Sequence, residues 1–213
     1  MPGSAAHRTY DSTLRQKAAA QTRLAIIEAA RGLLSERGWS GTTIRRVAES
    51  AGVAIETVYS SVGGKVDLLS VAIDVGVGGD ADPIPLRERP AFQALGRGDR
   101  RARFQAAASL LEDIYGRTAG INRALTEAAF ADARARELRE QLQLRQRSDV
   151  GLGLRLVLDR AASQTEIDET WALIAFETYD NLVRGAGWTS EQYTQWLTRT
   201  LALLHPVTTE AAR

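Results

Sequence analysis

Residues 42–65, TTIRRVAESAGVAIETVYSSVGGK, constrain the fold of this 213-residue chain more than any other segment. Their spacing predicts a helix over residues 43–50, a tight turn and a second short helix. Gly52 provides the left-handed backbone that such a turn requires, and Ala48 is small enough for two helices to meet at roughly 90–120°. The apolar side chains expected to hold the two helices together are Val47, Val53 and Val58. The segment is typical of a DNA-reading helix-turn-helix.

Apolar residues recur at helical spacing along nearly the whole chain, which predicts an all-α fold. Residues 76–90, GVGGDADPIPLRERP, contain three glycines and three prolines and are expected to form a loop. The last two helices have recognisable starts: Thr165 with Asp168 resembles a cap with an acidic third position, and Thr189 with Gln192 forms a capping-box pattern.

The charge distribution separates the two ends of the chain. Residues 1–65 carry nine Lys and Arg against five Asp and Glu, a net charge of +4, whereas residues 66–213 carry a net charge of −3. A basic N-terminal part, residues 1–65, on an acidic remainder suits DNA binding by the N-terminal part alone. So small an excess of positive charge also arises by chance.

Several function classes are excluded by the sequence. The two histidines, His7 and His205, lie near opposite ends, so no histidine-based metal motif exists. Residues 76–81 match G-x-G-x-x-A, the fingerprint of dinucleotide-binding folds. Prolines follow where the helix of such a fold would have to begin, so a dinucleotide-binding site is excluded. We therefore expect no enzyme, no metal and no cofactor. The absence of cysteine, of a signal peptide and of a long apolar run predicts a cytoplasmic protein without membrane contact.

Residues 22–53, TRLAIIEAARGLLSERGWSGTTIRRVAESAGV, and residues 58–69, VYSSVGGKVDLL, resemble the TetR family of bacterial transcriptional regulators. The first segment is similar to the family's first helix, glycine-aromatic corner and second helix. The second is similar to the end of its recognition helix and the start of its fourth helix. The resemblance implies a repressor that binds a palindromic DNA operator as a homodimer and is released by a small-molecule effector.

The domain organisation follows from this resemblance. We expect a flexible N-terminal arm over residues 1–21, a three-helix DNA-binding domain with the helix-turn-helix over residues 22–68, and a C-terminal helical effector-binding and dimerisation domain over residues 69–213. The basic residues of the arm, Arg8, Arg15 and Lys17, either lie in a minor groove or belong to a leader that partly extends the first helix.

The resemblance also implies DNA contacts. Thr42 and Thr43 are placed to hold a phosphate at a helix N-terminus, although either of them also suits a plain N-cap role. Thr57 and Tyr59 match positions that touch phosphate and base edges, and Lys65 matches a backbone-contacting lysine. For Tyr59 the alternative is a core aromatic, and for Lys65 an ordinary surface lysine.

Further contacts are expected from the residues themselves. Arg45 and Arg46 lie on the exposed side of the first helix of the motif, where they either reach phosphates or remain solvated surface charges. The side chains expected to contact base edges are Ile55, which suits a thymine methyl, Glu56, which suits a cytosine amino group, and Ser60, which suits almost any base. Glu56 alternatively steadies the dipole of its helix.

The recognition helix departs from the family pattern. Ala54 and Ile55 stand where the family usually has Ser-Lys, so a cap and a phosphate-binding cation are lost. This departure supports an alternative function, an all-α small-molecule-binding or interaction protein whose head no longer reads DNA.

The C-terminal helices carry apolar side chains on two sides, and one side requires a partner. The expected homodimer interface consists of Trp171, Phe176, Tyr179, Val183, Tyr193, Trp196, Leu197, Leu201 and Leu204. The alternative is a core formed entirely within one chain. Aromatic residues at helical spacing predict either an effector pocket for a lipophilic compound or ordinary core, and these residues are Phe104, Tyr115, Phe130, Trp171 and Phe176.

Overall fold

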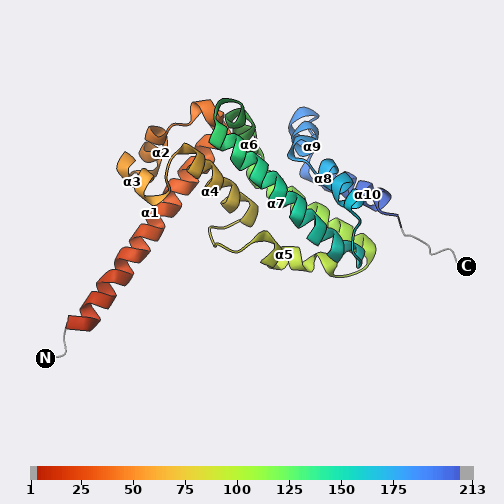
Figure 1. Cartoon of the computed structure of the whole chain (residues 1–213), viewed down its shortest axis with the longest axis horizontal. Coiled ribbons are helices and arrows are strands. Elements are labelled where there is room, and N and C mark those ends of the chain that lie inside the picture. Colours follow the sequence, from red (N-terminus) through yellow and green to blue (C-terminus); the bar gives the residue numbers. More distant parts are fainter. Residues whose placement is uncertain (1–3, 207–213) are drawn as a thin grey trace, which may run out of the picture. The chain divides into compact units, whose positions relative to one another are not determined.

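The computed structural model describes residues 4–206, with side chains from residue 15 onward, and this part of the chain is built from helices and turns (Figure 1). The prediction of an all-α fold is confirmed. The α-helices are α1 (Ser4–Gly41), α2 (Ile44–Ala51), α3 (Ile55–Ser61), α4 (Lys65–Gly78), α5 (Pro90–Gln93), α6 (Arg100–Ala131), α7 (Ala133–Leu158), α8 (Gln164–Leu173), α9 (Phe176–Asp180) and α10 (Ser190–Leu204). Two 3₁₀ turns and a π-helical turn connect them, at Leu86–Glu88, Ala94–Gly96 and Asn181–Gly185.

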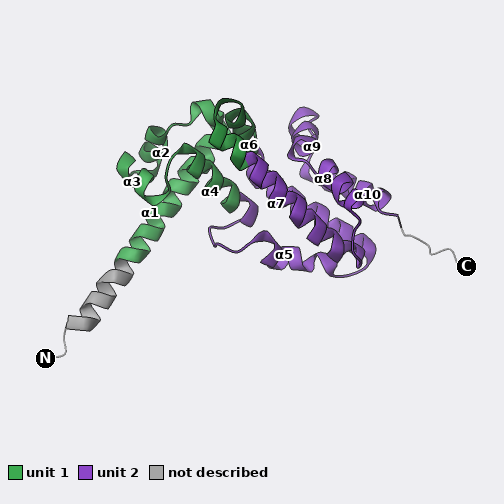
Figure 2. Cartoon of the chain, viewed as in Figure 1, with its two compact units in different colours: residues 1–75, 120–138 green, residues 76–119, 139–213 purple. Residues whose placement is uncertain are grey.

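The chain forms two compact units, coloured separately in Figure 2. The N-terminal unit contains residues 1–75 and 120–138, and the C-terminal unit contains residues 76–119 and 139–213. The predicted boundary at residue 68 therefore lies inside α4, and α6 and α7 each contribute residues to both units. Within residues 4–206, none of the helices combines the length and the hydrophobicity that a membrane span requires.

The segment expected to be a flexible arm, residues 1–21, is helical from Ser4 onward. The physical reason is composition: residues 4–21 contain no glycine or proline and include the strong helix formers Ala18–Ala20. Residues 1–3 and the side chain of Arg8 lie outside the described residues, and Arg15 and Lys17 are exposed. The helical geometry of α1 is interrupted near its end by Gly38, at φ 66°.

The core of the N-terminal unit is built from buried side chains of α1, α2, α3 and α4, together with the parts of α6 and α7 that belong to this unit. Side chains of α1, α2, α3 and α6 are fully or almost fully buried there, among them Ile26, Leu34, Val47, Val58 and Ile121. Gly120 allows close approach of α6 to α1, because a Cβ at Gly120 would lie 2.6 Å from the Cα of Ser35. The part of α6 from residue 120 onward is thus packed within the unit that carries the helix-turn-helix.

The C-terminal unit has its own aromatic and aliphatic core. The buried members are Phe92, Leu95, Phe104, Ala108, Ile114, Tyr115, Val150, Leu154, Val157, Leu158, Ile174, Tyr179, Tyr193, Leu197 and Leu201. Tyr193 and Leu197 are completely inaccessible to solvent. The structure therefore confirms a sizeable helical core in this part of the chain.

Capping explains where the last helices begin. The capping box of Thr189 and Gln192 is confirmed at the start of α10. The cap predicted at Thr165 with Asp168 is wrong, because Ser163 and Glu166 form the capping box and α8 begins two residues earlier. Glu166 completes this box by accepting from the Ser163 backbone, which an Asp side chain at 168 cannot reach from inside the helix.

The helical segment that begins with α8 is interrupted before it reaches α10. The α8 helix ends at Leu173, α9 occupies only Phe176–Asp180, and a π-helical turn follows. At the break, the carbonyl of Ile174 accepts a hydrogen bond from the hydroxyl of Tyr115. A buried tyrosine thereby satisfies a backbone group that a continuous helix would have paired internally.

Candidate DNA-binding site

The helix-turn-helix begins and ends with well-defined caps. The hydroxyl oxygen of Thr43 accepts a hydrogen bond from the backbone N–H of Arg46 at 3.2 Å, so Thr43 is the N-cap of α2. Gly52 closes this helix in the left-handed conformation, at φ 67° and ψ 33°. Val47 and Ala48 are buried, as predicted. The geometry fixes a sharp turn between α2 and α3.

The recognition helix α3 exposes one face and buries the other. Val58 is completely buried, whereas Tyr59 is 56% exposed. Glu56 and Ser60 are also exposed, and Ile55 and Thr57 are half-buried. Tyr59 is therefore a surface aromatic, and its alternative placement in the core is excluded. Ala54 provides no side-chain cap, as predicted.

The two threonines before α2 have different roles. Thr42 is 1% exposed, and its hydroxyl donates to the carbonyl oxygen of Gly38 at 2.8 Å. This places Thr42 in the corner between α1 and α2, away from solvent, in contrast with the expectation that it touches DNA. Thr43 is exposed at the helix start and remains accessible to a phosphate.

The arginines of α2 are both exposed but differ in their contacts. The guanidinium of Arg46 donates to the carbonyl oxygen of Gly41 at 2.6 Å. Arg45 has no hydrogen bond or ion pair to any described residue. Its charge is therefore available to an external anion without breaking an internal contact.

Lys65 at the start of α4 is tied to the preceding corner. Its ammonium donates to the carbonyl oxygen of Trp39 at 2.5 Å and lies 3.8 Å from the centre of the indole ring. The side chain is half-buried, and burial lowers the pKa of Lys65 despite the opposing charges of Glu127 and Asp132. Lys65 is thus a structural cation as well as a candidate phosphate contact.

Glu127 of α6 holds the same corner and was missed by sequence reasoning. Its carboxylate accepts from the backbone N–H groups of Trp39 at 2.8 Å and Ser40 at 3.0 Å, and from the Ser40 hydroxyl. These bonds, the hydroxyl of Ser40 foremost, hold the pKa of Glu127 below its usual range. No local motif predicts a contact that spans 88 residues.

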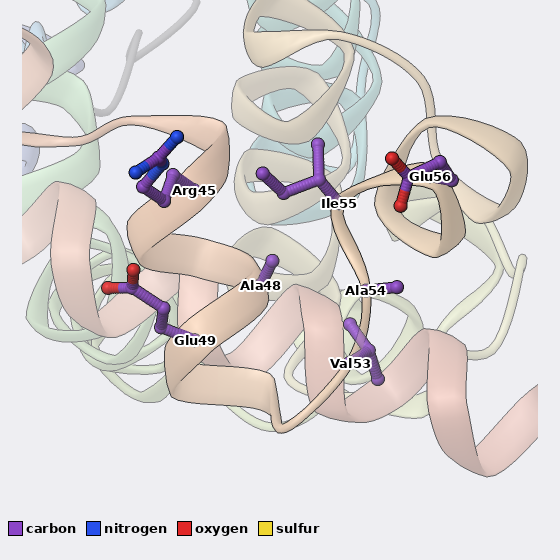
Figure 3. A pocket seen from close by; sticks show the side chains of 7 residues that line it. All are labelled: Arg45, Ala48, Glu49, Val53, Ala54, Ile55 and Glu56. Atoms are coloured by element: carbon purple, nitrogen blue, oxygen red, sulfur yellow. The ribbon is translucent and has the colours of Figure 1, made fainter.

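An open hollow of about 340 Å³ lies between α2 and the start of α3. Figure 3 shows Ile55 between Arg45 of α2 and Glu56 of α3 in this view. The lining residues are Arg45, Ala48, Glu49, Val53, Ala54, Ile55 and Glu56. The lining combines apolar side chains with charged groups, a combination that suits a base edge with a methyl group.

The aromatic residues expected to line an effector pocket are not all brought together. Phe104 and Tyr115 are buried in the core of the C-terminal unit, and Trp171 and Phe176 are half-buried against it. Phe130 belongs to the N-terminal unit and is 82% exposed, so it is not a member of this cluster.

The residues expected in the dimer interface divide into two groups. Four of them are buried within their own chain, namely Tyr179, Tyr193, Leu197 and Leu201. Five are half-buried and retain accessible surface, namely Trp171, Phe176, Val183, Trp196 and Leu204. The first group forms intramolecular core, and only the second offers surface to a partner.

The capped turn, the buried inner face and the exposed outer face of α3 together define a helix-turn-helix of the kind that presents its second helix to DNA. Residues 26–72 match the model for the bacterial regulatory proteins of the tetR family. This match covers α2 and α3 and the helices that flank them, so the part of the chain that carries the helix-turn-helix is similar to the DNA-binding part of the tetR-family regulators.

Solved structures share the fold. A transcriptional regulator from Rhodococcus sp. Rha1 is 19% identical, with a TM-score of 0.60 over 85% of this chain and 95% of that one. A member of the TetR family from Streptomyces coelicolor A3 is 21% identical, with a TM-score of 0.60 over 87% of this chain and 99% of that one. No curated protein matches the sequence.

Proposed function

We propose that this protein is a homodimeric repressor that binds a palindromic DNA operator and is released from it by a small-molecule effector. The single observation that carries the proposal is the outer face of α3, where Tyr59 is 56% exposed while Val58 anchors the same helix in the core. An exposed tyrosine on a recognition helix offers both an aromatic ring and a hydroxyl to a binding partner.

DNA recognition is assigned to two sets of groups. The phosphate contacts are Thr43, Arg45 and Arg46, with Thr57 and Lys65 beside the groove, because a helix N-terminus and cations attract phosphate. The base contacts are Ile55, Glu56, Tyr59 and Ser60, which α3 carries in the hollow and on its exposed face. Ile55 suits a thymine methyl, and Glu56 suits a cytosine amino group.

The homodimer is supported by apolar surface on the last helices. Trp196, Thr200 and Leu203 follow one face of α10 at helical spacing, and Leu203 is 80% exposed. With the half-buried Trp171 and Phe176, they offer the apolar centre that a stable interface needs. Two heads related by a two-fold axis would read two half-sites about one helical turn apart or a multiple of it.

Selection from a pool of random DNA duplexes tests the proposal. Purified full-length protein is incubated with the pool, and the bound duplexes are sequenced. The expected result is enrichment of one inverted repeat, together with a dimer in analytical ultracentrifugation. Leu203→Glu should weaken the dimer without unfolding the chain, whereas Leu144→Glu, at a side chain 68% exposed on α7, serves as the matched control.

The alternative function is an effector-binding or interaction protein whose head does not read DNA. One observation favours it: among the described residues of α2, α3 and the start of α4, both Arg46 and Lys65 donate to backbone carbonyls, and α3 itself carries no cation. Selection without any enriched sequence, from protein shown to be folded and dimeric, would support this alternative and reject the repressor.

A further inference from the structure

A stripe of buried side chains holds α10 in the core of the C-terminal unit, and the last member of the stripe is a histidine. Tyr193, Leu197 and Leu201 are at most 3% exposed and follow one another at intervals of four residues. His205, four residues further on, is the C-cap of the helix and is 1% exposed. Helical spacing places these positions on one face of α10. The stripe therefore ends in a buried imidazole, a group that can acquire a proton near neutral pH.

The surroundings of His205 fit a neutral ring. The imidazole lies nearly parallel to the ring of Phe104 of α6, at an interplanar angle of 11° and with 6.3 Å between the ring centres. Its Nε2 lies 2.8 Å from the hydroxyl oxygen of Thr170 of α8, which is itself buried. A hydroxyl can donate to a bare ring nitrogen or accept from a protonated one, so this hydrogen bond forms in either neutral tautomer. The neutral ring is thus held between α6 and α8.

The charges around His205 oppose a proton on its ring. Among the described residues, the charged groups that act on the imidazole are Glu166, Arg160 and Arg100. Oε1 of Glu166 lies 3.6 Å from Nδ1 of His205, but this carboxylate already accepts from Arg160 at 2.6 and 3.1 Å and from the Ser163 backbone at 2.8 Å. Arg100 donates to the carbonyl oxygen of His205. Two cations and one anion face the ring, so protonation would add a third positive charge to a buried site that is already net positive.

The direction of the pKa shift agrees with this geometry. Burial lowers the pKa of His205 below its ordinary value of 6.5, against the opposing effect of Glu166, and the charges of Arg160 and Arg100 lower it further. Because the folded-state pKa is the lower one, the stabilisation that neutral His205 provides is complete above pH 6.5. It is lost as the pH falls from 6.5 towards the folded-state pKa.

His205 is the main attachment of the last turn of α10. Among residues 202–206, all of which the structure describes, it is the one fully buried side chain. Leu204 is half-buried, and Leu203 is 80% exposed. The buried positions upstream, Leu197 and Leu201, carry no titratable group. Loss of the His205 contacts would therefore free the last turn and leave the rest of α10 in the core.

We propose that His205, Thr170 and Phe104 form a pH-sensitive switch, in which the neutral imidazole holds the last turn of α10 against α6 and α8 and the protonated imidazole releases it. The three residues belong to the C-terminal unit, and none of them is among the proposed DNA contacts. The switch therefore goes beyond the proposed function and does not depend on it.

An NMR titration of the imidazole C–H signals tests the first part of the proposal, that the fold keeps the ring neutral. The chain has two histidines, so His7→Gln leaves His205 as the source of a single imidazole signal. We expect this signal to titrate with a midpoint below pH 6.5. A midpoint at or above pH 6.5 would overturn the proposal, because the folded protein would then hold the protonated ring as well as the neutral one or better.

Amide hydrogen exchange, measured by NMR on the full-length protein, tests the second part, the release of the last turn. Protection factors, which remove the intrinsic pH dependence of exchange, are compared above pH 6.5 and below the His205 midpoint. We expect about a tenfold or larger loss of protection at residues 202–205, and unchanged protection from Tyr193 to Leu201. Unchanged protection at residues 202–205, or an equal loss along the whole of α10, would reject the switch.

A variant identifies the group that is responsible. His205→Gln cannot titrate in this range, but its amide can still donate to or accept from the Thr170 hydroxyl. Protection at residues 202–205 should therefore be the same at both pH values in His205→Gln, whereas the matched control His7→Gln should lose it as the unchanged protein does. The same loss in His205→Gln would assign the pH effect to another group and reject the proposal. If His205→Gln fails to fold, the titration and the exchange measured in His7→Gln still decide.

Discussion

The ammonium nitrogen of Lys65 lies 2.5 Å from the carbonyl oxygen of Trp39, directly beside the corner that Glu127 holds through the neighbouring backbone N–H groups. A carbonyl and two amides of one turn are thus paired with a cation from α4 and an anion from α6. The corner leads straight into α2, whose N-cap is Thr43, one of the proposed phosphate contacts. The orientation of the DNA-binding helices therefore depends on side chains from outside the helix-turn-helix itself.

Glu127→Gln should lower the free energy of unfolding by about 1 kcal/mol at pH 7, because a charged acceptor of three hydrogen bonds becomes neutral. The folded state holds the pKa of Glu127 below its ordinary value of 4.5. This stabilisation is present above pH 4.5 and is lost as the pH falls through the folded-state pKa. Urea unfolding measures the difference in the free energy of unfolding between the variant and the unchanged protein. This difference should be smaller below the folded-state pKa than at neutral pH. Glu36→Gln, at an exposed acid of α1, is the control.

Ala54→Ser should stabilise the protein by about 1 kcal/mol, because α3 begins without a side-chain cap and a serine hydroxyl can accept from a free N–H of the first turn. For a chain of this size, that change corresponds to a rise in melting temperature of about 2–4 °C. Calorimetry would measure it. Ala54→Val, which has no acceptor, should give no rise, and an equal rise would exclude capping as the cause.

Gly120→Ala should destabilise the N-terminal unit by about 1–3 kcal/mol, because the new Cβ would lie 2.6 Å from the Cα of Ser35 and force α6 away from α1. Gly32→Ala is the matched control. Nothing lies within 4 Å of a Cβ at Gly32, so this change should stabilise α1 by up to about 1 kcal/mol. Chemical unfolding of both variants would check the opposite signs, and equal signs would contradict the close approach of the two helices.

Tyr59→Ala should weaken binding to the selected duplex about tenfold or more, a loss of at least about 1.4 kcal/mol. The free energy of unfolding should change by less than about 0.5 kcal/mol, because the side chain is 56% exposed. Fluorescence anisotropy and urea unfolding measure the two quantities. Val58→Ala, in contrast, should lower the free energy of unfolding, because Val58 is completely buried. Unchanged DNA affinity in Tyr59→Ala would remove Tyr59 from the interface.

Arg45→Gln should reduce the slope of the logarithm of DNA affinity against the logarithm of salt concentration by about 1, the value for one lost phosphate contact. Because Arg45 has no internal partner among the described residues, the free energy of unfolding of this variant should equal that of the unchanged protein. Anisotropy titrations over a range of salt concentrations give the slope. A slope equal to that of the unchanged protein would mean that Arg45 is a solvated surface charge.

Much of the N-terminal unit could be predicted because its determinants are local. The turn at Gly52 follows from a residue type that tolerates positive φ, and the missing cap at Ala54 follows from the absence of a side-chain oxygen. The buried Val47 and Ala48 follow from helical spacing. Each of these features depends on a few neighbouring residues, and each is confirmed by the structure.

The rest depends on contacts between distant residues. The Glu127 contact joins positions 87 and 88 residues apart, and the break after α8 is matched by Tyr115, 59 residues from Ile174. The buried state of Tyr193 and the exposed state of Phe130 likewise depend on which helices meet. Apolar periodicity shows that one face of a helix is buried. It does not tell whether the chain's own core, a partner or a ligand covers that face.

The N-terminal unit consists of two segments, residues 1–75 and residues 120–138. This division limits how the unit that carries the helix-turn-helix can be exchanged with that of another protein. A chimera that takes only residues 1–75 from this protein would carry its recognition helix and lose Glu127 together with the apolar residues of α6 that cover α1. Transplanting the operator preference without loss of stability requires that both segments move as a set. The proposed DNA contacts and the side chains that hold their corner in place therefore lie on two separate stretches of sequence, residues 1–75 and 120–138.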